Sequence, residues 1–328
     1  MSKKVLVTGG SGFIGSALVR GLLREGWHVR CLDDNSRGNP RRLEGIMDDI
    51  EFIPGDVRDA DVVDQAMRGM DAVAHLAYVN GTEFFYKKPQ LVLEVGIKGV
   101  LWTLESAIRH GVPEYWYMSS SEVYQTPPMI PTDESAPFMI PDPLNPRYSY
   151  GGGKAASELM AINYGRGVFE KTVIVRPHNV YGPDMGWEHV IPQFALRAKE
   201  AAAANPSGPV QFPIQGDGSA QRSFCHIDDF TEGCLLAYLK GADQNIYHIG
   251  TQFEHTIRDV AEMVVREVGR EAQIIPGPEP AGATQRRVPN TAKIEALGYR
   301  ASIPLAKGLE DTVGWYVAND HLMPAKSE

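Results

Sequence analysis

The residues whose types and spacing most clearly suggest chemistry are Tyr150 and Lys154, in the stretch YSYGGGKAASEL. On a helix, side chains four positions apart project from one face. A phenol beside an ammonium group can act as a general base, because the positive charge favours the phenolate. Lowering a tyrosine pKa from about 10 to neutrality needs about 4–5 kcal/mol, and a helix N-terminus supplies only about 0.3–2 kcal/mol. Lys154 and a further cation must therefore contribute.

The helical pattern itself is clear only over residues 155–164, and the turn before it contains glycines 151–153. Each glycine would cost about 1 kcal/mol against alanine if it were helical. We expect these glycines to let the backbone approach a bound ligand where side chains would block it. The alternative is a plain loop, with Tyr150 and Lys154 as unrelated surface residues.

A second candidate site is the glycine-rich turn in VLVTGGSGFIG, which places Gly9, Gly12 and Gly15 between a strand and a helix. The first two allow backbone N–H groups to approach a pyrophosphate, and the third permits helix–strand packing. Asp33 ends the next strand about 20 residues on, where a carboxylate can hold a ribose 2′-OH and repel a 2′-phosphate. These spacings predict NAD as the cofactor. Because Arg37 is nearby, NADP is not ruled out as the cofactor. The alternative to a cofactor site is an ordinary strand–helix turn followed by a surface aspartate.

The elements that must position these residues alternate between β-rich runs and amphipathic patterns. We expect strands at 4–8, 29–32, 50–54, 72–76, 115–119 and 172–176, and helices at 16–25, 61–68, 91–110 and 155–164. This alternation predicts an α/β fold with a Rossmann-type, doubly wound parallel sheet. Beyond residue 178 the pattern turns irregular. We predict an NAD-binding domain at 1–178, to which 226–250 returns, and a smaller α/β C-terminal substrate domain at 179–225 and 251–328.

The composition narrows the class of protein. The 328 residues carry a net charge of −9, which argues against nucleic acid or an anionic membrane as the partner. Three cysteines (Cys31, Cys225 and Cys234) lack metal-ligand spacing, so we expect reduced thiols and no metal site. The N-terminus runs into an apolar segment without a signal peptide core, and no apolar run reaches the roughly 20 residues that span a bilayer. We expect a soluble, cytoplasmic protein.

Taken together, the motifs resemble those of the extended short-chain dehydrogenase/reductase family, in particular its NAD-dependent sugar-nucleotide epimerase/dehydratase branch. The first turn has the spacing Gly-x-x-Gly-x-x-Gly. The later motifs are HLA at 75–77, SSSEVY at 119–124, YxxxK at 150–154, RPHNVYGP at 176–183 and RSFCHIDD at 222–229. The likeness runs through nearly the whole chain, and the joint order is more specific than any single motif.

The resemblance implies a role for each site residue. Tyr150, Lys154 and Ser120 would be catalytic, with Ser120 bonded to the reacting hydroxyl. Glu122 would act as an acid or base, or else form a structural ion pair. Ser121 stays an open candidate, because its side chain would point away if the strand persisted.

The resemblance also implies the binding residues. The cofactor would contact Gly9, Gly12, Phe13, Ile14, Gly15, Asp33, Asp56, Val57, Leu76 and Ala77, with Tyr150 and Lys154; Asp56 would reach the adenine amine. A nucleotide-diphosphate sugar would contact Asn179, Arg222, Arg287 and Tyr78, with His178 in the pocket wall. Tyr78 stands where the family usually has a small residue, and Gly96 stands where many epimerases have asparagine. Both changes would reshape the pocket near the nicotinamide.

In that branch a base takes the sugar 4-OH proton while the C4 hydride passes to NAD⁺, and the keto sugar then follows one of several routes. Return of the hydride to the other face gives an epimerase, loss of CO₂ a decarboxylase, and loss of water a dehydratase. Dehydratases often have aspartate at the position of Ser121. The sequence therefore predicts a UDP-glucose 4-epimerase-like enzyme. The alternatives are an NDP-uronic acid decarboxylase or NDP-sugar 4,6-dehydratase using Glu122, a plain alcohol dehydrogenase, and a non-catalytic NAD-binding regulator. Helices 91–110 and 155–164 resemble the family's dimer interface, so we expect a homodimer.

Overall fold

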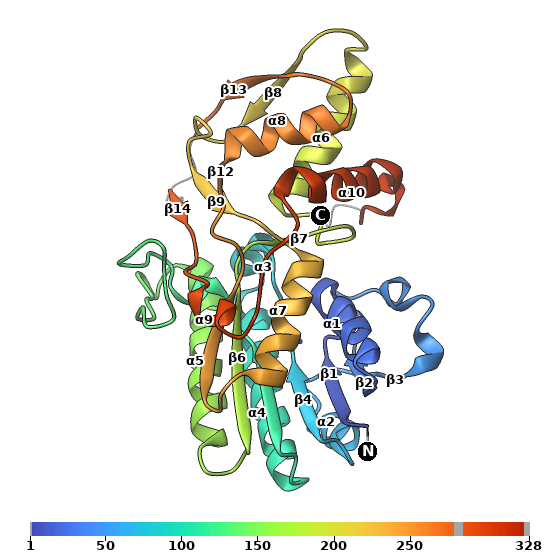
Figure 1. The fold of residues 1–328 in the computed structure, drawn as a ribbon, viewed down its shortest axis with the longest axis vertical. Helices are drawn as coiled ribbons and strands as arrows, with labels where there is room; N and C mark the ends of the chain where they lie inside the picture. The colour runs from blue at the N-terminus through green and yellow to red at the C-terminus, as the bar shows by residue number, and fades with distance from the viewer. Residues whose placement is uncertain (1, 279–284, 325–328) are drawn as a thin grey trace.

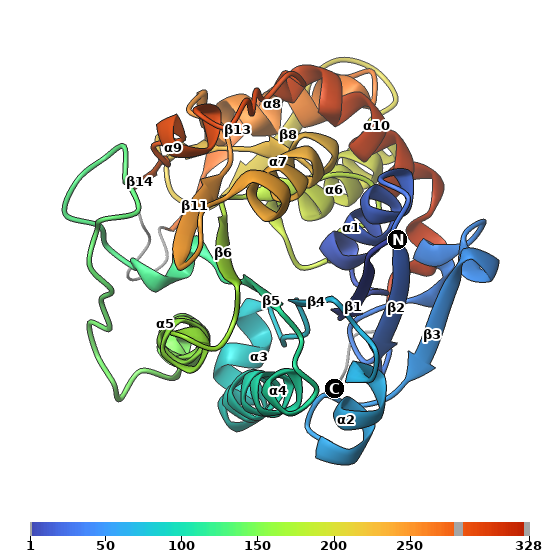
Figure 2. The same ribbon diagram turned by 60° about the horizontal axis from the view of Figure 1, so that its bottom comes forward.

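The computed structural model describes residues 2–278 and 285–324. Its centre is a seven-stranded, all-parallel sheet in the order β11-β6-β5-β4-β1-β2-β3 (Figures 1 and 2). The strands are β1 (Lys4–Thr8), β2 (His28–Asp33), β3 (Ile50–Pro54), β4 (Ala72–His75), β5 (Glu114–Met118), β6 (Lys171–Pro177) and β11 (Asn245–Ile249). The strand order reverses between β1 and β4, and a crevice opens at the carboxyl ends at such a point. The predicted α/β fold class is confirmed.

Apolar side chains cover both faces of this sheet. Along β1, Val5 and Val7 enter one core and Leu6 the other, as expected when successive side chains alternate. Figure 2 shows helices on both sides of the sheet. Those of the first core are α1 (Phe13–Arg24) and α7 (Ile227–Lys240); those of the second are α2 (Ala60–Met67), α4 (Pro89–Arg109) and α5 (Ser149–Gly165).

The chain leaves this sheet after β6 and comes back to it with α7 and β11. Strand β11 pairs in parallel with β6, with Asn245 opposite Val173. The segment 226–250 thus supplies the seventh strand and one covering helix.

The remaining residues form a smaller lobe with its own apolar core at the carboxyl end of the sheet (Figure 1). Its elements are α6 (Val190–Ala204), α8 (Ile257–Glu267), α10 (Leu305–Ala318), the parallel pair β8 (Val210–Ile214) and β13 (Ala272–Pro276), and the three-stranded sheet β12 (Glu254–Thr256), β9 (Gln221–Ser223) and β14 (Arg286–Arg287). Helix α6 lies where the sequence looked irregular. It has Pro192 in its first turn, where a missing N–H is tolerated.

Short elements complete the fold. They are α3 (Thr82–Lys87), α9 (Ala292–Glu295), the bridged strands β7 (Val180–Tyr181) and β10 (Cys225–His226), and the 3₁₀ turns η1 (Pro40–Leu43), η2 (Met47–Asp49), η3 (Ser121–Val123), η4 (Pro146–Tyr148) and η5 (Asp320–Leu322). Among the residues that the structure describes, no helix is both long enough and apolar enough to cross a membrane.

Candidate active site

A cavity of about 450 Å³ opens at the carboxyl ends of the parallel strands and is lined by residues of both lobes. The site residues named from the sequence that line it are Gly9, Gly12, Phe13, Ile14, Gly15, Asp33, Asp56, Val57, Leu76, Ala77, Tyr78, Ser120, Ser121, Glu122, Tyr150, Lys154, Asn179 and Arg287. Arg222 does not line it, and neither does His178, which was expected in the pocket wall. Residues from widely separated parts of the sequence therefore share one cavity.

The glycine-rich turn forms one end of this cavity. Gly9 has φ +74°, and a Cβ there would lie 2.8 Å from the backbone nitrogen of Ala77. A Cβ on Gly15 would overlap the carbonyl oxygen of Gly9, so Gly15 packs against the turn itself and not, as expected, against the strand. Gly12 begins α1 without a side-chain cap, which leaves the first N–H groups of the helix available to an anionic ligand.

Asp33 is tied to this turn. Its carboxylate accepts hydrogen bonds from the backbone N–H of Ser11 at 2.9 Å and of Asn35 at 2.8 Å. Carboxylate oxygens have two lone pairs each, so Asp33 can still accept from a ribose hydroxyl. Arg37 donates to the carbonyl oxygen of Asn80 at 3.0 Å and pairs with Glu188 at 3.4 Å, so its guanidinium is already engaged. The glycine cradle, the open helix end and this carboxylate fit NAD.

Asp56, at the start of the segment after β3, is paired with Arg58 at 2.5 Å. The hydrogen bond from the Arg58 side chain holds the pKa of Asp56 below its usual value. Asp56 is therefore ionised at neutral pH, and its carboxylate can accept from an adenine amine.

The end of β4 is held beneath the cavity by Thr8. The Thr8 hydroxyl accepts from the backbone N–H of Leu76 at 3.2 Å and of Ala77 at 3.3 Å, and lies 2.8 Å from Nδ1 of His75. Burial, followed by the nearby charge of Lys154, lowers the pKa of His75 to about 3. His75 is therefore neutral and structural.

The end of β5 brings three consecutive serines to the site. The strand stops at Met118 and the chain turns into η3, so the alternation that would have turned Ser121 away does not persist. Ser120 caps η3, and its hydroxyl accepts from the backbone N–H of Glu122 at 3.1 Å. The Ser119 hydroxyl instead donates to the buried carboxylate of Glu158.

Helix α5 begins at Ser149, so glycines 151–153 are helical and the alternative of a loop there is wrong. A Cβ on Gly151 would lie 2.6 Å from the carbonyl oxygen of Glu122, and one on Gly153 would overlap the hydroxyl of Tyr78. The expectation that these glycines make room for a ligand is therefore corrected, because the space beside both is filled by protein atoms.

Tyr150 is enclosed by aromatic rings. It stacks on Phe85 with centroids 5.0 Å apart and meets the edge of Tyr78 at 5.2 Å. Burial raises the pKa of Tyr150, the hydrogen bond with Ser120 lowers it, and the charge of Glu122 raises it further. In this environment the phenol is protonated at neutral pH, so a cation is needed beside it before it can act as a base.

Lys154 lies one turn further along α5, and its Nζ donates to the carbonyl oxygen of Met118 at 2.6 Å. The same nitrogen stands 4.0 Å from the ring centroid of Tyr78. Burial lowers the pKa of Lys154 to about 7, and the charge of Glu158 opposes that shift. The charged and neutral forms of Lys154 are therefore close in free energy near neutral pH.

Glu122 forms an ion pair with Arg287, which joins η3 to β14 of the smaller lobe. Burial would raise the pKa of Glu122. The charge and hydrogen bond of Arg287, and to a smaller extent the charges of Arg147 and Arg222, hold that pKa below its usual value. The structural ion pair that the sequence left open is thus present, and Glu122 is a carboxylate with weakened basicity.

Arg222 and Arg287 are neighbours in the three-stranded sheet, where they are register partners on β9 and β14. Arg222 donates to the carbonyl oxygen of Gln221 at 2.7 Å, and burial, followed by the charge of Arg287, lowers its pKa to about 10. Asn179 adopts φ +43° and its amide donates to the carbonyl oxygen of Ser223 at 2.8 Å. Two cations therefore lie side by side on adjacent strands, and Arg287 is the one that lines the cavity.

A buried polar network lies behind the serines. The guanidinium of Arg176 donates hydrogen bonds to the two carboxylate oxygens of Glu158 at 2.8 and 2.6 Å. Arg176 also donates to the hydroxyl of Tyr124, which lies 2.6 Å from Nε2 of His248. His178, expected in the pocket wall, packs instead against His248 in the interior, with ring centroids 4.6 Å apart.

Several site residues were missed from the sequence. Arg147 on η4 lines the cavity, and its place three residues before Tyr150 was the available signal. The sequence around Phe85 contained no comparable signal, because aromatic residues are common on short helices. Glu158 could have been noticed, since it lies one helical turn beyond Lys154.

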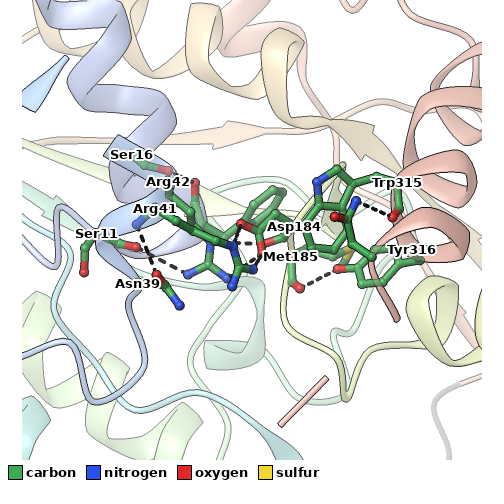
Figure 3. A network of polar contacts seen from close by, with 11 residues as sticks. Ser11, Ser16, Asn39, Arg41, Arg42, Asp184, Met185, Trp315 and Tyr316 are labelled. Carbon is green, nitrogen blue, oxygen red and sulfur yellow. Dashed lines mark hydrogen bonds and ion pairs between the residues drawn. The ribbon is translucent and has the colours of Figure 1, made fainter. Parts of the chain in front are cut away.

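A contact between the lobes encloses the glycine-rich turn. Figure 3 shows Arg41 and Arg42 pointing toward Asp184, a residue that follows β7. The Arg42 guanidinium lies 3.1 Å from Oδ1 of Asp184 and also donates to the carbonyl oxygen of Ser11 at 3.3 Å; Arg41 pairs with the same carboxylate. Because Ser11 belongs to the glycine-rich turn, this contact couples the turn to the smaller lobe.

Residues 5–250 match the model of the NAD dependent epimerase/dehydratase family. The chain belongs to that family. It is 31% identical to a dTDP-glucose 4,6-dehydratase from Streptomyces niveus over 96% of this chain and 93% of the relative. A UDP-N-acetyl-alpha-D-glucosaminuronate decarboxylase from Bacillus cytotoxicus is 28% identical over 98% and 100% of the two chains. The resemblance drawn from the motifs is confirmed.

A solved structure extends the comparison to the fold. The UDP-glucose 4-epimerase of Thermus thermophilus, in complex with NAD, superposes with a TM-score of 0.81 at 29% identity, covering 96% of this chain and 99% of that one. The prediction of NAD as the cofactor is confirmed, and this epimerase/dehydratase family member is an NAD-dependent enzyme. Proteins named for three different reactions share its fold or sequence, so the reaction must be argued from the site.

Proposed function

We propose that the protein is an NAD-dependent nucleotide-diphosphate-sugar 4-epimerase. The observation that carries the proposal is the state of Glu122, which is ion-paired with Arg287 and preceded by Ser121, not by a second carboxyl group. The groups then left for proton transfer are Ser120, Tyr150 and Lys154. A reversible oxidation at one carbon needs no others.

Dehydration would ask more of the site. It requires a base to take the C5 proton and an acid to release the C6 hydroxyl as water. Arg287 lowers the pKa of Glu122, which makes that carboxylate a poorer base. Ser121 carries a hydroxyl that is not acidic enough to replace a carboxylic acid. These two features argue against the 4,6-dehydratase alternative.

In the proposed reaction, Tyr150 accepts the proton of the sugar 4-OH while Ser120 hydrogen-bonds the same oxygen. The glycine-rich turn and Asp33 would hold NAD⁺, which would supply the acceptor for the C4 hydride, and return of that hydride to the opposite face of the 4-keto sugar would invert C4. Tyr150 then gives the proton back, and the Lys154 ammonium stabilises the phenolate that is present before the first proton transfer and again after the second. Every atom of the sugar is retained, so the product is an isomer and no cofactor is consumed.

The nucleotide end of the substrate is assigned to the paired arginines. Arg222 and Arg287 stand side by side on adjacent strands, and guanidinium groups form charge-assisted bonds with diphosphate oxygens. They provide local positive charge in a chain whose net charge is −9. Relatives named for dTDP-glucose and for a UDP-linked uronic acid are consistent with this substrate class.

Decarboxylation of an NDP-uronic acid is the second candidate, and one observation favours it. Arg287, Arg147 and Arg222 all act on the Glu122 carboxylate. A uronic acid C6 carboxylate could replace Glu122 as the partner of these cations, and oxidation at C4 would then make it a β-keto acid.

The test is incubation of the purified protein and NAD with UDP-, GDP- and dTDP-sugars and the corresponding uronic acids, followed by chromatography and mass spectrometry. An isomer of unchanged mass supports the epimerase. Loss of CO₂ or of water would replace it with the decarboxylase or the dehydratase. Net accumulation of NADH, followed by its absorbance, would instead indicate a plain alcohol dehydrogenase.

We also infer a homodimer formed through α4 and α5. These helices expose large apolar side chains on the outer surface, among them Leu93 at 40% and Leu159 at 54%. Exposed apolar groups of this size on two adjacent helices suit a helix–helix interface. Light scattering that gives twice the chain mass at micromolar concentration would support the dimer.

A further inference from the structure

Tyr78 occupies a slot between α4 and α5 that two glycines leave open. A Cβ on Gly96 would overlap the Tyr78 hydroxyl and two ring carbons, Cζ and Cε2. A Cβ on Gly153 would overlap only the hydroxyl, because the ring carbon Cζ would be at an ordinary contact distance of 3.6 Å. Both glycines are therefore needed for the phenol to lie where it does.

In this slot the ring of Tyr78 faces the Lys154 ammonium. Nζ stands 4.0 Å from the Tyr78 centroid, against 4.9 Å for Tyr117 and 5.8 Å for Tyr150. A cation this close to a ring face is attracted by the negative face of the ring. On its other side Nζ donates to the carbonyl oxygen of Met118 at 2.6 Å. The ammonium is thus held between a carbonyl oxygen and a ring.

The hydroxyl of Tyr78 contributes nothing to this arrangement. Within residues 2–278 and 285–324 it is buried and has no hydrogen-bond partner. An unpaired buried hydroxyl is unfavourable. The part of the side chain that acts on Lys154 is therefore the ring.

We propose that Tyr78 is a positioning residue, whose ring face holds the Lys154 ammonium next to Tyr150, and that Gly96 and Gly153 are glycines because the phenol occupies the space of their side chains. The consequence for catalysis rests on the proposed function, whereas the packing and the hold on Lys154 do not.

The titratable groups that face Lys154 come from several elements. They are His75 at the end of β4, Tyr78 after it, Tyr117 on β5, and Tyr150 and Glu158 on α5. Burial lowers the pKa of Lys154 to about 7. Stabilisation of the ammonium by the Tyr78 ring therefore decides whether charged or neutral Lys154 dominates at neutral pH. His75 is neutral throughout this range, and Glu158 is bound by Arg176.

The first experiment measures the protonation of Lys154 directly. The protein is labelled with ¹³C-lysine, the Lys154 ε-carbon signal is assigned by its loss in Lys154→Arg, and its pH titration is followed by NMR. Tyr78→Phe keeps the ring and should leave the Lys154 pKa unchanged. Tyr78→Leu removes the ring and should lower it by about one unit. An unchanged or raised pKa in Tyr78→Leu, or a shift in Tyr78→Phe, would overturn the proposal.

The second experiment tests the slot and needs no active enzyme. Gly153→Ala should lower the urea midpoint of unfolding, and adding Tyr78→Phe should restore it to the wild-type value or above, because alanine is a better helix residue than glycine. Gly96→Ala provides the matched contrast. It should not be restored by Tyr78→Phe, since the ring carbons still overlap.

Rescue of both alanine variants, or of neither, would show that Tyr78 does not fill the slot. The first experiment measures the protonation of Lys154 and the second measures packing through stability. Their outcomes therefore do not depend on which sugar reaction the protein performs. A failed substrate test would leave them unaffected.

Discussion

Glu122 and Arg287 are 165 positions apart in the sequence and form an ion pair in the lining of the cavity. The pair links a turn after β5 to a short strand of the smaller lobe. It keeps Glu122 ionised, and Arg287 is also the register partner of Arg222 on the neighbouring strand. In the proposed function, this single contact bears both on the reaction type and on the binding of the nucleotide.

Replacing Glu122 by glutamine separates the proposed reactions. If Glu122 only holds Arg287, Glu122→Gln should lower kcat less than about 10-fold, because loss of a general acid or base usually costs about 10²–10⁴-fold. The measurement is kcat on the substrate found by mass spectrometry. A fall of more than about 10²-fold would mean that Glu122 transfers a proton in the reaction.

Tyr150→Phe removes the proposed base and keeps the stacked ring. We expect kcat to fall by about 10²–10⁴-fold while NAD remains bound, since only the hydroxyl changes. Turnover and the NAD content of the purified variant provide the two readouts. A wild-type protein without measurable turnover, whose biological activity survives in Tyr150→Phe, would favour the non-catalytic regulator.

The buried Lys154 predicts a specific pH dependence of stability. Burial lowers its pKa from 10.5 to about 7, so in that window the unfolded chain binds a proton that the folded protein does not. The free energy of unfolding therefore rises as pH increases from about 7 toward 10.5, and the cost of burying the charged lysine is fully present below pH 7. Relative to Lys154→Met, the wild type should gain about 2–3 kcal/mol in free energy of unfolding between pH 6 and pH 9. Parallel curves for the two proteins from urea titrations would contradict the shift.

Asp184 connects the lobes through two arginines, and Asp184→Ala would leave Arg41 and Arg42 without that carboxylate. We expect the free energy of unfolding to fall by about 1–3 kcal/mol, and bound NAD to be lost faster during dialysis. The more exposed pair Arg37–Glu188 is the control, and Glu188→Ala should cost at most about 1 kcal/mol. Equal losses of stability in the two variants would argue against a special role for Asp184.

The dimer prediction rests on the exposed face of α5. Leu159→Glu places a charge where Leu159 is 54% exposed in the single chain, and should convert a dimer to a monomer in light scattering. Leu239→Glu, on α7 at 38% exposure, is the matched control and should remain dimeric. A wild-type protein that is already monomeric would refute the interface.

The strands were predictable because their signals are local. The bounds expected for β1 and β3 match those of the structure. Helix α6 lies in the stretch beyond residue 178 whose pattern looked irregular, because it is stabilised by packing with α8 and α10 around a core that no local pattern reveals.

The candidate site shows the same division. Tyr150 and Lys154 share a helix face by spacing alone, and Gly9 was expected in a tight turn, where it adopts positive φ. The purpose of glycines 151–153 was misjudged, because their neighbours are Glu122, Gln125, Ile140 and Tyr78. Those contacts form only when η3, the loop before η4 and the end of β4 meet α5.

The amino-acid sequence alone determined the parallel sheet, the NAD-binding turn and the tyrosine–lysine pair, because each depends on residues a few positions apart or on a repeated local pattern. Tertiary structure decided that Glu122 is paired with Arg287, that Tyr78 faces Lys154, and that Asp184 joins the lobes. The physical reason is that charge pairing, burial and steric fit depend on distances in space, which folding sets between segments that are remote in the chain.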